Sequence, residues 1–512
     1  MKFEIDPFEF VPSKSVLKKV KIVASKEKLT AAAGLGTLIE IFDQSGLKDQ
    51  FIKCLPSRTS SRSIGSYKLA LNMLCGFING FDCLDDFDHM DREHALKALF
   101  DEDIPAARTL GDYLRDFSEE NIADLNKFVS RMGWGMLHSL SKNLPDQYAP
   151  DTACLDIDST DHPQSGNKIE GVAWNYKNNW CLDSQVVFDQ MGFCHGFDLR
   201  AGNTKSGVGA DWLLDLALTD GKRQMQRKFE GKTFVRADSA YCKQDVFKVL
   251  LKKGALFTLT AHNGTTHWKD RFVKEGLSWQ PWKYSSKQLD WALDKEKELP
   301  EVDLARFYWT PSWSEKDGKK LMFPIIVKRT LNKERFEEIR RTNTQLRLVQ
   351  DDGYLKEDPY DYYAVVTNFP LDLATDRSGQ SEREQKIKRY GLQEVMEHHQ
   401  KRGSMENFIR EEKYAYDLKH FPCLKMGANQ AYGLLSMVAH NLLRWVSVMM
   451  SPDRPHFSKK LRNRFIFHAG KVVRTAGQTF LQIIEQGYKE VMLLRETWGF
   501  KSERVPLQCS SA

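Results

Sequence analysis

Two aspartates in the chain each follow a short apolar run that is typical of a buried β-strand. Asp158 ends the run in residues 155–158 (LDID), Asp238 ends the run in residues 235–238 (VRAD), and a serine follows each. An aspartate at the carboxyl end of a strand points into the crevice where α/β sheets bind ligands. On neighbouring strands, two such carboxylates could share one metal ion. Asp156 shares a strand face with Asp158, because side chains alternate with period two, but Asp158 lies nearer the strand end.

A third segment, residues 398–413, places an acid among basic and polar side chains. At about 100° per residue, one arc of roughly 60° on an α-helix holds His399, Arg402, Glu406 and Lys413. An acid on such a face suits a site that binds metal and phosphate together. Gly403 weakens the helix prediction, because a glycine costs about 1 kcal/mol in a helix interior.

Each aspartate also has a plainer interpretation. Asp–Ser pairs often begin turns, so Asp158 and Asp238 could be turn or cap residues. For either aspartate alone the two interpretations have similar weight, and the third segment favours a site. Asp156 and Asp161 stay open as substitutes or as supporting acids.

The segments that must position these residues alternate between strands and helices. Strand-like runs occupy residues 153–158, 184–188, 193–199, 233–237 and 255–260. Helical runs lie between them, at residues 212–218 and 245–251. This alternation predicts a mixed α/β layer.

Changes in composition and in the spacing of apolar residues divide the chain into five regions. We expect a helical N-terminal region (1–150), a first core part (151–261), a mostly β insertion (262–368), a second core part with Glu406 (369–450) and a basic helical C-terminal region (451–512). Six of the twelve Trp fall inside the insertion. They predict either a small β core or, for one Trp, a surface that stacks on a base displaced near a cut.

The three acidic segments together resemble the signatures of bacterial insertion-sequence transposases of the DDE type, in the group one branch. The first acid of that family lies in a context matched here by residues 158–160 (DST), and the second in one matched by residues 238–241 (DSAY). The third lies in a Y-x2-R-x3-E-x6-K signature, matched over residues 399–413 except that His399 stands in place of Tyr. Asp238 lies 80 residues after Asp158 and Glu406 lies 168 after Asp238, so the second interval has room for an inserted domain.

The resemblance implies an α/β ribonuclease-H-like core that is interrupted by the β insertion. A helical N-terminal DNA-binding region (1–150) and a basic helical C-terminal region (451–512) would flank this core. It implies that Asp158, Asp238 and Glu406 are the catalytic acids and hold two divalent cations, Mg2+ or alternatively Mn2+. The enzyme would cut the ends of an insertion sequence and join the 3′-OH to target DNA by two-metal-ion phosphoryl transfer. His399, Arg402 and Lys413 would hold phosphates. The expected partners are double-stranded DNA, as terminal inverted repeats and target, and a second copy of the chain.

Two basic stretches, residues 14–28 and 454–474, could follow a DNA backbone. In the second stretch we expect phosphate contacts from Lys459, Lys460, Arg462, Arg464, Lys471 and Arg474. The alternative for each stretch is an ordinary solvated face.

The composition fits this hypothesis without requiring it. Seventy-five Lys and Arg against 69 Asp and Glu leave a net charge of +6, which does not by itself identify a DNA-binding protein. The N-terminus has no signal-peptide pattern, the most apolar stretch (433–450) is broken by polar residues, and no CxxC occurs, so we expect a cytoplasmic, nucleoid-associated bacterial protein without a membrane partner. In the homodimer, residues 433–444 would supply apolar contact surface. Two other functions stay open: a catalytically inactive DNA-binding protein descended from a transposase, and a metal-dependent nuclease without strand transfer.

Overall fold

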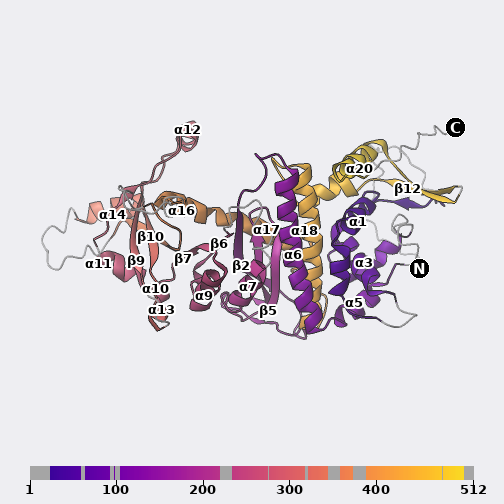
Figure 1. Cartoon of the computed structure of the whole chain (residues 1–512), viewed down its shortest axis with the longest axis horizontal. Coiled ribbons are helices and arrows are strands. Elements are labelled where there is room, and N and C mark those ends of the chain that lie inside the picture. The colour runs from indigo at the N-terminus through magenta and orange to yellow at the C-terminus, as the bar shows by residue number, and fades with distance from the viewer. Residues whose placement is uncertain are drawn as a thin grey trace, which may run out of the picture.

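The computed structural model describes residues 24–58, 64–92, 97, 104–219, 233–274, 276–316, 321–343, 358–372, 388–475 and 477–500. The described chain is elongated, with the insertion at one end and the N-terminal helices at the other (Figure 1). The α/β core lies between them. The core, which contains Asp158 and Asp238, therefore has the insertion on one side and the N-terminal helices on the other.

Five core strands form where the sequence predicts them: β2 (Ala153–Pro163), β4 (Trp180–Asp189), β5 (Cys194–Ala201), β6 (Thr233–Ala237) and β7 (Leu256–Thr260). β2 pairs antiparallel with β4 on one side and parallel with β6 on the other, and β6 pairs parallel with β7. The two predicted helices are confirmed as α7 (Ala210–Thr219) and α9 (Gln244–Lys253). This arrangement places the carboxyl end of β6 beside the middle of β2, at Ile157, and β2 continues from there to Pro163.

The strands of the insertion extend the core sheet. β7 pairs antiparallel with β11, and the sheet continues through β10 and β9 to β8. The bounds are β8 (Gln280–Pro281), β9 (Val302–Trp309), β10 (Phe323–Leu331) and β11 (Tyr360–Thr367). At the opposite edge, the short β3 (Ala173–Trp174) pairs with β4. The inserted residues therefore reach the site through an unbroken hydrogen-bonded sheet.

The expectation of a mostly β insertion is wrong, because its described residues also form helices. These are α10 (Asn263–Thr266), α11 (Trp268–Lys274), α12 (Ser286–Asp294), α13 (Ser312–Lys316) and α14 (Lys333–Asn343). Each is too short for a helical period to stand out from the neighbouring strand patterns. α12 begins with a capping box at Ser285 and Gln288, and it projects away from the rest of the chain (Figure 1).

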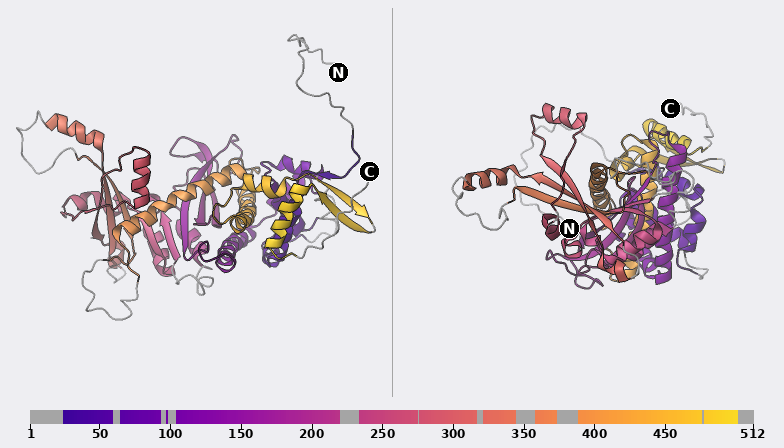
Figure 2. Two further views of the ribbon diagram at one scale, coloured as in Figure 1. Left: turned by 90° about the horizontal axis from the view of Figure 1, so that it is seen from above. Right: turned by 60° about the vertical axis from the view of Figure 1, so that its left-hand side comes forward.

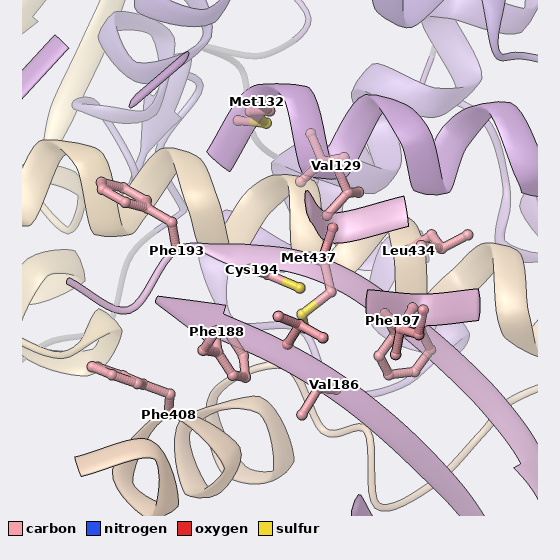
Figure 3. Packing of buried hydrophobic residues seen from close by; sticks show 14 of the residues in the cluster. Val129, Met132, Val186, Phe188, Phe193, Cys194, Phe197, Phe408, Leu434 and Met437 are labelled. Atoms are coloured by element: carbon pink, nitrogen blue, oxygen red, sulfur yellow. The ribbon is translucent and has the colours of Figure 1, made fainter. Parts of the chain in front are cut away.

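Two long helices cover the core sheet, α6 (Glu119–Asn143) and α18 (Met426–Met450), and they separate it from the N-terminal helices (Figure 1). Their side chains, among them Met132 and Met437, pack with Phe188 and Phe197 of the sheet (Figure 3). Residues 433–443 of α18 are buried inside the chain, so the expectation that they form a dimer surface is wrong. Among the described helices, none is both long and apolar enough to cross a membrane.

The free edge of β5 is covered by amide side chains from these two helices. Asn126 of α6 exchanges hydrogen bonds with the backbone of Phe197, at 2.7 and 3.2 Å. Asn441 of α18 does the same with the backbone of Cys194, at 2.7 and 2.9 Å. These pairs satisfy backbone groups that an edge strand would otherwise leave exposed, and they fix both helices against the sheet.

The N-terminal region is mainly helical, as predicted. Its described elements are β1 (Leu29–Thr30), α1 (Leu35–Gln44), α2 (Lys48–Lys53), α3 (Ser66–Asn79), the 3-10 helix η1 (Leu84–Arg92) and α5 (Ala107–Arg115), followed by α6. Tyr432 of α18 packs edge-on against Phe77 of α3, with ring centroids 4.9 Å apart. The N-terminal helices thus share a hydrophobic core with α18.

The expectation of a helical C-terminal region is wrong for residues 470–483. After α19 (Ser458–Leu461) and the short π-helix η4 (Arg462–Ile466), the chain forms a hairpin of β12 (Gly470–Thr475) and β13 (Gln478–Ile483). β12 also pairs with β1, and α20 (Glu485–Thr497) follows the hairpin. The partner strand β1 lies more than 400 residues earlier in the sequence than β12. Local periodicity cannot predict a pairing over such a distance.

The segment expected as one helix around Glu406 consists of three pieces. α16 (Leu392–Gln400) leads into a 3-10 turn, η3 (Lys401–Ser404), and then into α17 (Met405–Ala415). The turn contains Gly403, the residue that weakened the helix prediction. Together α16 and α17 run from the insertion towards the core (Figures 1 and 2).

Candidate active site

Asp158 and Asp238 lie side by side at the point where the parallel pairing of β2 with β6 ends. Ile157 of β2 is in register with Ala237 of β6, so the next residue along each strand is one of the two aspartates. Asp238 directly follows β6, whereas β2 continues past Asp158 to Pro163, so the expectation that Asp158 ends its strand is wrong.

The Oδ1 of Asp158 accepts a hydrogen bond from the Ser159 backbone N–H at 2.8 Å. The Oδ1 of Asp238 accepts one from the Ala240 backbone N–H at 2.8 Å and caps the 3-10 helix η2 (Ser239–Tyr241). The plainer cap interpretation therefore describes the local bond of Asp238, whereas Asp158 lies within β2 and caps no helix. Each bond fixes the orientation of its carboxylate.

The two carboxylates repel each other electrostatically. Burial raises the pKa of Asp158, the negative charge of Asp238 raises it further, and the charge of Arg402 acts in the opposite direction. A pair of partly buried acids of this kind is destabilised unless a positive charge lies nearby. Such a pair is a suitable ligand set for a divalent cation, which would relieve the repulsion.

Arg402 supplies one positive charge directly to this pair. Its Nη1 donates to the Oδ2 of Asp158 at 2.8 Å, and both side chains are about a fifth exposed. The charges of Asp158 and Asp238 hold the pKa of Arg402 above its usual value, although burial alone would lower it. Since Arg402 lies in η3, this contact attaches the turn before α17 to the middle of β2.

Glu406 lies in the first turn of α17, four residues after Arg402, and its side chain is exposed. The carboxylates of Asp158, Asp238 and Glu406 do not all lie within 4.8 Å of one another. Within the described part of the chain, the structure thus brings two of the three predicted acids together and places the third on an adjoining turn.

His399 is buried and lies in a cluster of hydroxyl groups. Its Nδ1 is 3.0 Å from the Oγ1 of Thr258, and its Nε2 is 3.0 Å from the Oγ1 of Thr260 and 2.8 Å from the hydroxyl of Tyr363. Burial, with the nearby charge of Arg402, lowers the pKa of His399 to about 3. The imidazole is therefore neutral near pH 7. Its phosphate-binding role stays a prediction, and its 2% exposure argues against direct contact in this conformation.

Asp156 is engaged in a buried ion pair one step deeper in the sheet. The Nε and Nη2 of Arg236 donate to its two oxygens at 2.6 and 2.7 Å, and the Nη1 of Arg236 donates to the carbonyl of His398 at 2.9 Å. Burial raises the pKa of Asp156 to about 6, while Arg236 opposes the shift. The bidentate pair occupies Asp156 and joins β2, β6 and α16.

Lys413 and Asp161 meet at the far end of α17. The Nζ of Lys413 lies 3.5 Å from the Oδ1 of Asp161. The side-chain amides of Asn179 and Asn175 donate to the other oxygen of Asp161 at 2.8 and 3.4 Å. Although burial alone would raise it, Asn179 and Lys413 hold the pKa of Asp161 below its usual value. α17 therefore lies beside β2 from Asp158 to Asp161.

The predicted basic residues of the C-terminal region differ in their surroundings. Lys459, Lys460 and Arg474 are exposed. Arg464 pairs with Glu490 at 3.0 Å, and Lys471 pairs with Glu27.

Arg462 differs from these residues, because it is buried. Its guanidinium donates to the backbone carbonyls of Phe77, Ile78 and Ala415, at 2.7 to 2.9 Å. Its DNA-binding role stays a prediction, and this position argues against a direct phosphate contact. Of the first basic stretch, residues 14–23 lie outside the described residues.

Two residues of the site have no counterpart in the sequence-based prediction, Arg236 and Tyr363. Arg236 carries a detectable signal, since it is a charged residue inside the apolar run that ends at Asp238. Tyr363 has no such signal in the sequence. Its strand, β11, lies next to His399 because β11 pairs with β7, and this pairing joins residues far apart in the chain.

Comparison with known families provides an independent finding. The family model described as "Transposase DDE domain group 1" matches residues 13–315 and 385–496, which make up most of the chain. No curated protein matches the chain. The interval between the two matched ranges includes β10, α14 and β11.

Proposed function

The chain belongs to the group 1 family of DDE transposases, and we propose that it cuts the ends of an insertion sequence and joins them to target DNA. One observation carries this proposal: the register of β2 and β6 places Asp158 and Asp238 together at the sheet edge. Arg402 links this pair to the turn that precedes Glu406. The family and the site geometry thus support the same chemistry.

We assign the metal-binding role to Asp158, Asp238 and Glu406. When bound, two divalent cations (Mg2+, or Mn2+) would stabilise the attacking and leaving oxygens of an in-line phosphoryl transfer. The donor set fits this role, because it consists of partly buried and exposed carboxylates around one sheet edge. Movement of the first turn of α17 would bring Glu406 to the two aspartates.

The other residues of the site would bind and orient DNA. Arg402 can bind a phosphate through two parallel hydrogen bonds, whereas Lys413 acts as a point charge. His399, held by Thr258, Thr260 and Tyr363, fixes the end of α16 immediately before Arg402. We therefore assign to His399 a positioning role towards Arg402 in place of the phosphate contact that the resemblance implies.

The same arrangement can serve two successive reactions. Displacement by water would cut a strand at the element's end and free its 3′-OH. Displacement by that 3′-OH would then join the element to a target strand. Both steps need the same bound phosphate geometry and differ only in the nucleophile.

We further propose the wider setting of the reaction. A homodimer would hold two terminal inverted repeats together with target DNA in the bacterial nucleoid. Exposed Lys459, Lys460 and Arg474, with Arg464 and Lys471, would contact the DNA backbone. Such contacts supply affinity but carry no sequence information.

The experiment that tests this function is cleavage of DNA carrying the element's ends by an Asp238→Ala variant. We expect the cleavage rate to fall at least about a hundredfold, since one carboxylate of the metal site is lost, while binding to the same DNA persists. Asp245→Asn is the matched control, because Asp245 is an exposed aspartate seven residues further along the chain. Cleavage by Asp238→Ala at the control rate would remove Asp238 from the mechanism.

A strand-transfer assay with pre-nicked ends distinguishes the remaining alternatives. Joined product supports a transposase. Nicks at intact ends without any joined product indicate a nuclease. Tight DNA binding with neither product indicates a catalytically inactive descendant.

A further inference from the structure

The loop between β2 and β4 ends in a hairpin tip, residues 174–180, that presents aromatic side chains to solvent. Trp174 is 62% exposed and Tyr176 is 86% exposed, the highest fraction among the exposed large hydrophobic side chains. Large exposed aromatics cost free energy in water, so a pair of them on one small turn marks an interaction site.

The backbone of this hairpin tip is held rigidly. The Oδ1 of Asn175 accepts hydrogen bonds from the backbone N–H groups of Lys177 and Asn179, each at 2.9 Å. The Asn175 N–H donates to the Asn179 carbonyl at 2.9 Å, and Asn178 takes the left-handed conformation that closes the turn (φ 58°). Few residues tolerate that conformation as well as asparagine. The aromatic rings are therefore displayed from a fixed frame.

The base of the loop is anchored to the core on both sides. Glu170 donates its backbone N–H to the carbonyl of Leu424 at 2.8 Å, and Gln164 donates its side-chain amide to the carbonyl of Lys419 at 2.7 Å. Trp180 packs beneath Trp174, with ring centroids 5.4 Å apart, and its indole N–H donates to the carbonyl of Gly166 at 3.1 Å. Trp174 thus has one side supported by protein.

The hairpin tip is linked directly to the candidate active site. Asn175 and Asn179 bind Asp161, and Asp161 pairs with Lys413 of α17. Asp161 lies three residues after Asp158 on β2, a distance of about 10 Å along the strand.

Asp158 is in register with Val186 of β4, and Trp180 of the tip lies six residues from Val186. Successive nucleotides of one DNA strand are about 3.4 Å apart along the axis. The tip therefore begins about 20 Å from Asp158, a span of about six nucleotides along one strand.

The hairpin tip carries one positive charge and no acid of its own, which suits an anionic partner. No acid occurs from residue 171 to residue 182, and Lys177 projects from the tip with its Nζ 5.4 Å from the Tyr176 ring centroid. Aromatic rings beside a basic groove bind unpaired nucleobases, because every base has a π-face on which a ring can stack. A protein partner would need a larger continuous apolar area than two separate rings provide.

We propose that the hairpin tip is a stacking site for an unpaired nucleobase of the DNA strand next to the cut, with Trp174 and Tyr176 as the stacking residues. This inference rests on the proposed function, because only a chain that cuts DNA would hold a DNA strand next to the hairpin tip. It differs from the expectation that a Trp of the insertion stacks on a base, since Trp174 lies in the core loop. The site would recognise local strand opening and would not discriminate between bases.

The test compares binding to a forked duplex that carries a single-stranded thymine flank with binding to the fully paired duplex, without divalent metal. We expect the wild-type chain to bind the fork about tenfold more tightly, since stacking on an aromatic ring contributes a factor of this order per base. Trp174→Ala and Tyr176→Ser should each remove most of this preference. Tyr176→Phe should retain it, because the ring remains.

Phe336→Ala is the matched control, because Phe336 is a 42% exposed aromatic side chain on α14, outside the hairpin tip, and should leave the preference unchanged. A 4-thiothymidine in the unpaired flank should crosslink to the hairpin tip. An unchanged fork preference in both Trp174→Ala and Tyr176→Ser would overturn the proposal, even if these variants altered self-association. Metal-dependent cleavage by the wild-type chain, measured separately, reports on the proposed function alone.

Discussion

Glu412 is a buried carboxyl on α17 that takes no part in the proposed chemistry. It is fully buried, and neither of its oxygens has a hydrogen-bond partner among the described residues. Burial raises its pKa from 4.5 to about 8, and the charge of Lys413 only partly opposes this shift. The helix that carries Glu406 therefore contains a carboxyl that is neutral near pH 7.

This burial predicts a loss of stability as the pH rises. Between about pH 4.5 and 8 the folded chain keeps a proton on Glu412 that the unfolded chain has lost. The free energy of unfolding should therefore fall across this window, by up to about 1.4 kcal/mol per pH unit. Glu412→Gln should remove this slope, so that the variant gains stability over the wild type as the pH rises. Urea unfolding at pH 5, 6.5 and 8 measures the effect.

Glu406→Gln serves as the control for Glu412, because it changes an exposed carboxylate on the same helix. Its unfolding free energy should follow the pH dependence of the wild type. If the curves of the wild type and Glu412→Gln ran parallel, Glu412 would not be the neutral buried acid inferred from the structure.

Single residues differ in how far the sequence predicts their roles. Asp158 and Asp238 could be predicted because each follows an apolar strand run, so the strand pattern itself places them at a sheet edge. His399 could be predicted to lie near the site, but its burial could not, because its partners come from two strands distant in sequence. Arg462 looked like part of a basic face because local charge does not show which side chains turn inwards.

The buried Asp156–Arg236 pair joins two strands and a helix. Because Arg236 also binds the carbonyl of His398, it connects the end of α16 to β2 and β6. Asp156→Asn would leave a buried guanidinium without its counter-charge and should lower the free energy of unfolding by about 3–5 kcal/mol. Urea denaturation followed by circular dichroism measures this change.

The double variant Asp156→Leu/Arg236→Met checks the cause of that loss. Replacing both charges by apolar groups removes the unpaired charge and should recover most of the stability. Lys489→Ala removes one partner of an exposed pair and should change stability by less than about 1 kcal/mol. A double variant as unstable as Asp156→Asn would show that the pair contributes through shape and hydrogen bonding, and not through charge balance.

Secondary structure was predictable where local patterns were strong. The core strands, α7, α9 and the apolar helix α18 follow from alternation or helical period within one segment. The break at η3 had one local signal, Gly403, which weakened the helix prediction without locating the break. The β12–β13 hairpin had none, since β12 pairs with β1 from the opposite end of the sequence. The helices of the insertion are short, so tertiary contacts and caps determine them more than periodicity does.

In the whole chain, the core lies between the insertion and the two terminal regions. The insertion lies at one end, and the basic C-terminal elements lie at the other beside the N-terminal helices (Figure 1). The sequence predicted this order of regions from texture and from the interval between Asp238 and Glu406. It did not predict that the insertion continues the core sheet, because strand pairing between β7 and β11 depends on contacts over 100 residues apart.

The exposed lysines of α19, Lys459 and Lys460, should make the DNA affinity of the chain depend on salt concentration. Replacing both Lys459 and Lys460 by Ala should weaken DNA binding and reduce the slope of log K against log salt by about 1.8, since each phosphate contact contributes about 0.9. Fluorescence anisotropy of a labelled duplex at several salt concentrations measures the slope.

The matched control is Lys287→Ala/Lys295→Ala, which removes the same charge from exposed positions at α12 and directly after it. This control should keep the wild-type slope. Equal slopes in the two double variants would mean that α19 makes no phosphate contact.

Mapping of bound metal by iron-mediated backbone cleavage tests the three-carboxylate site most directly. Fe2+ replaces Mg2+ in the DNA complex, and peroxide generates radicals that cut the chain close to the bound ion. We predict cuts at three separate places, around Asp158, Asp238 and Glu406, which excess Mg2+ suppresses and Asp238→Ala abolishes. Cuts near Asp158 and Asp238 with none near Glu406 would contradict the account.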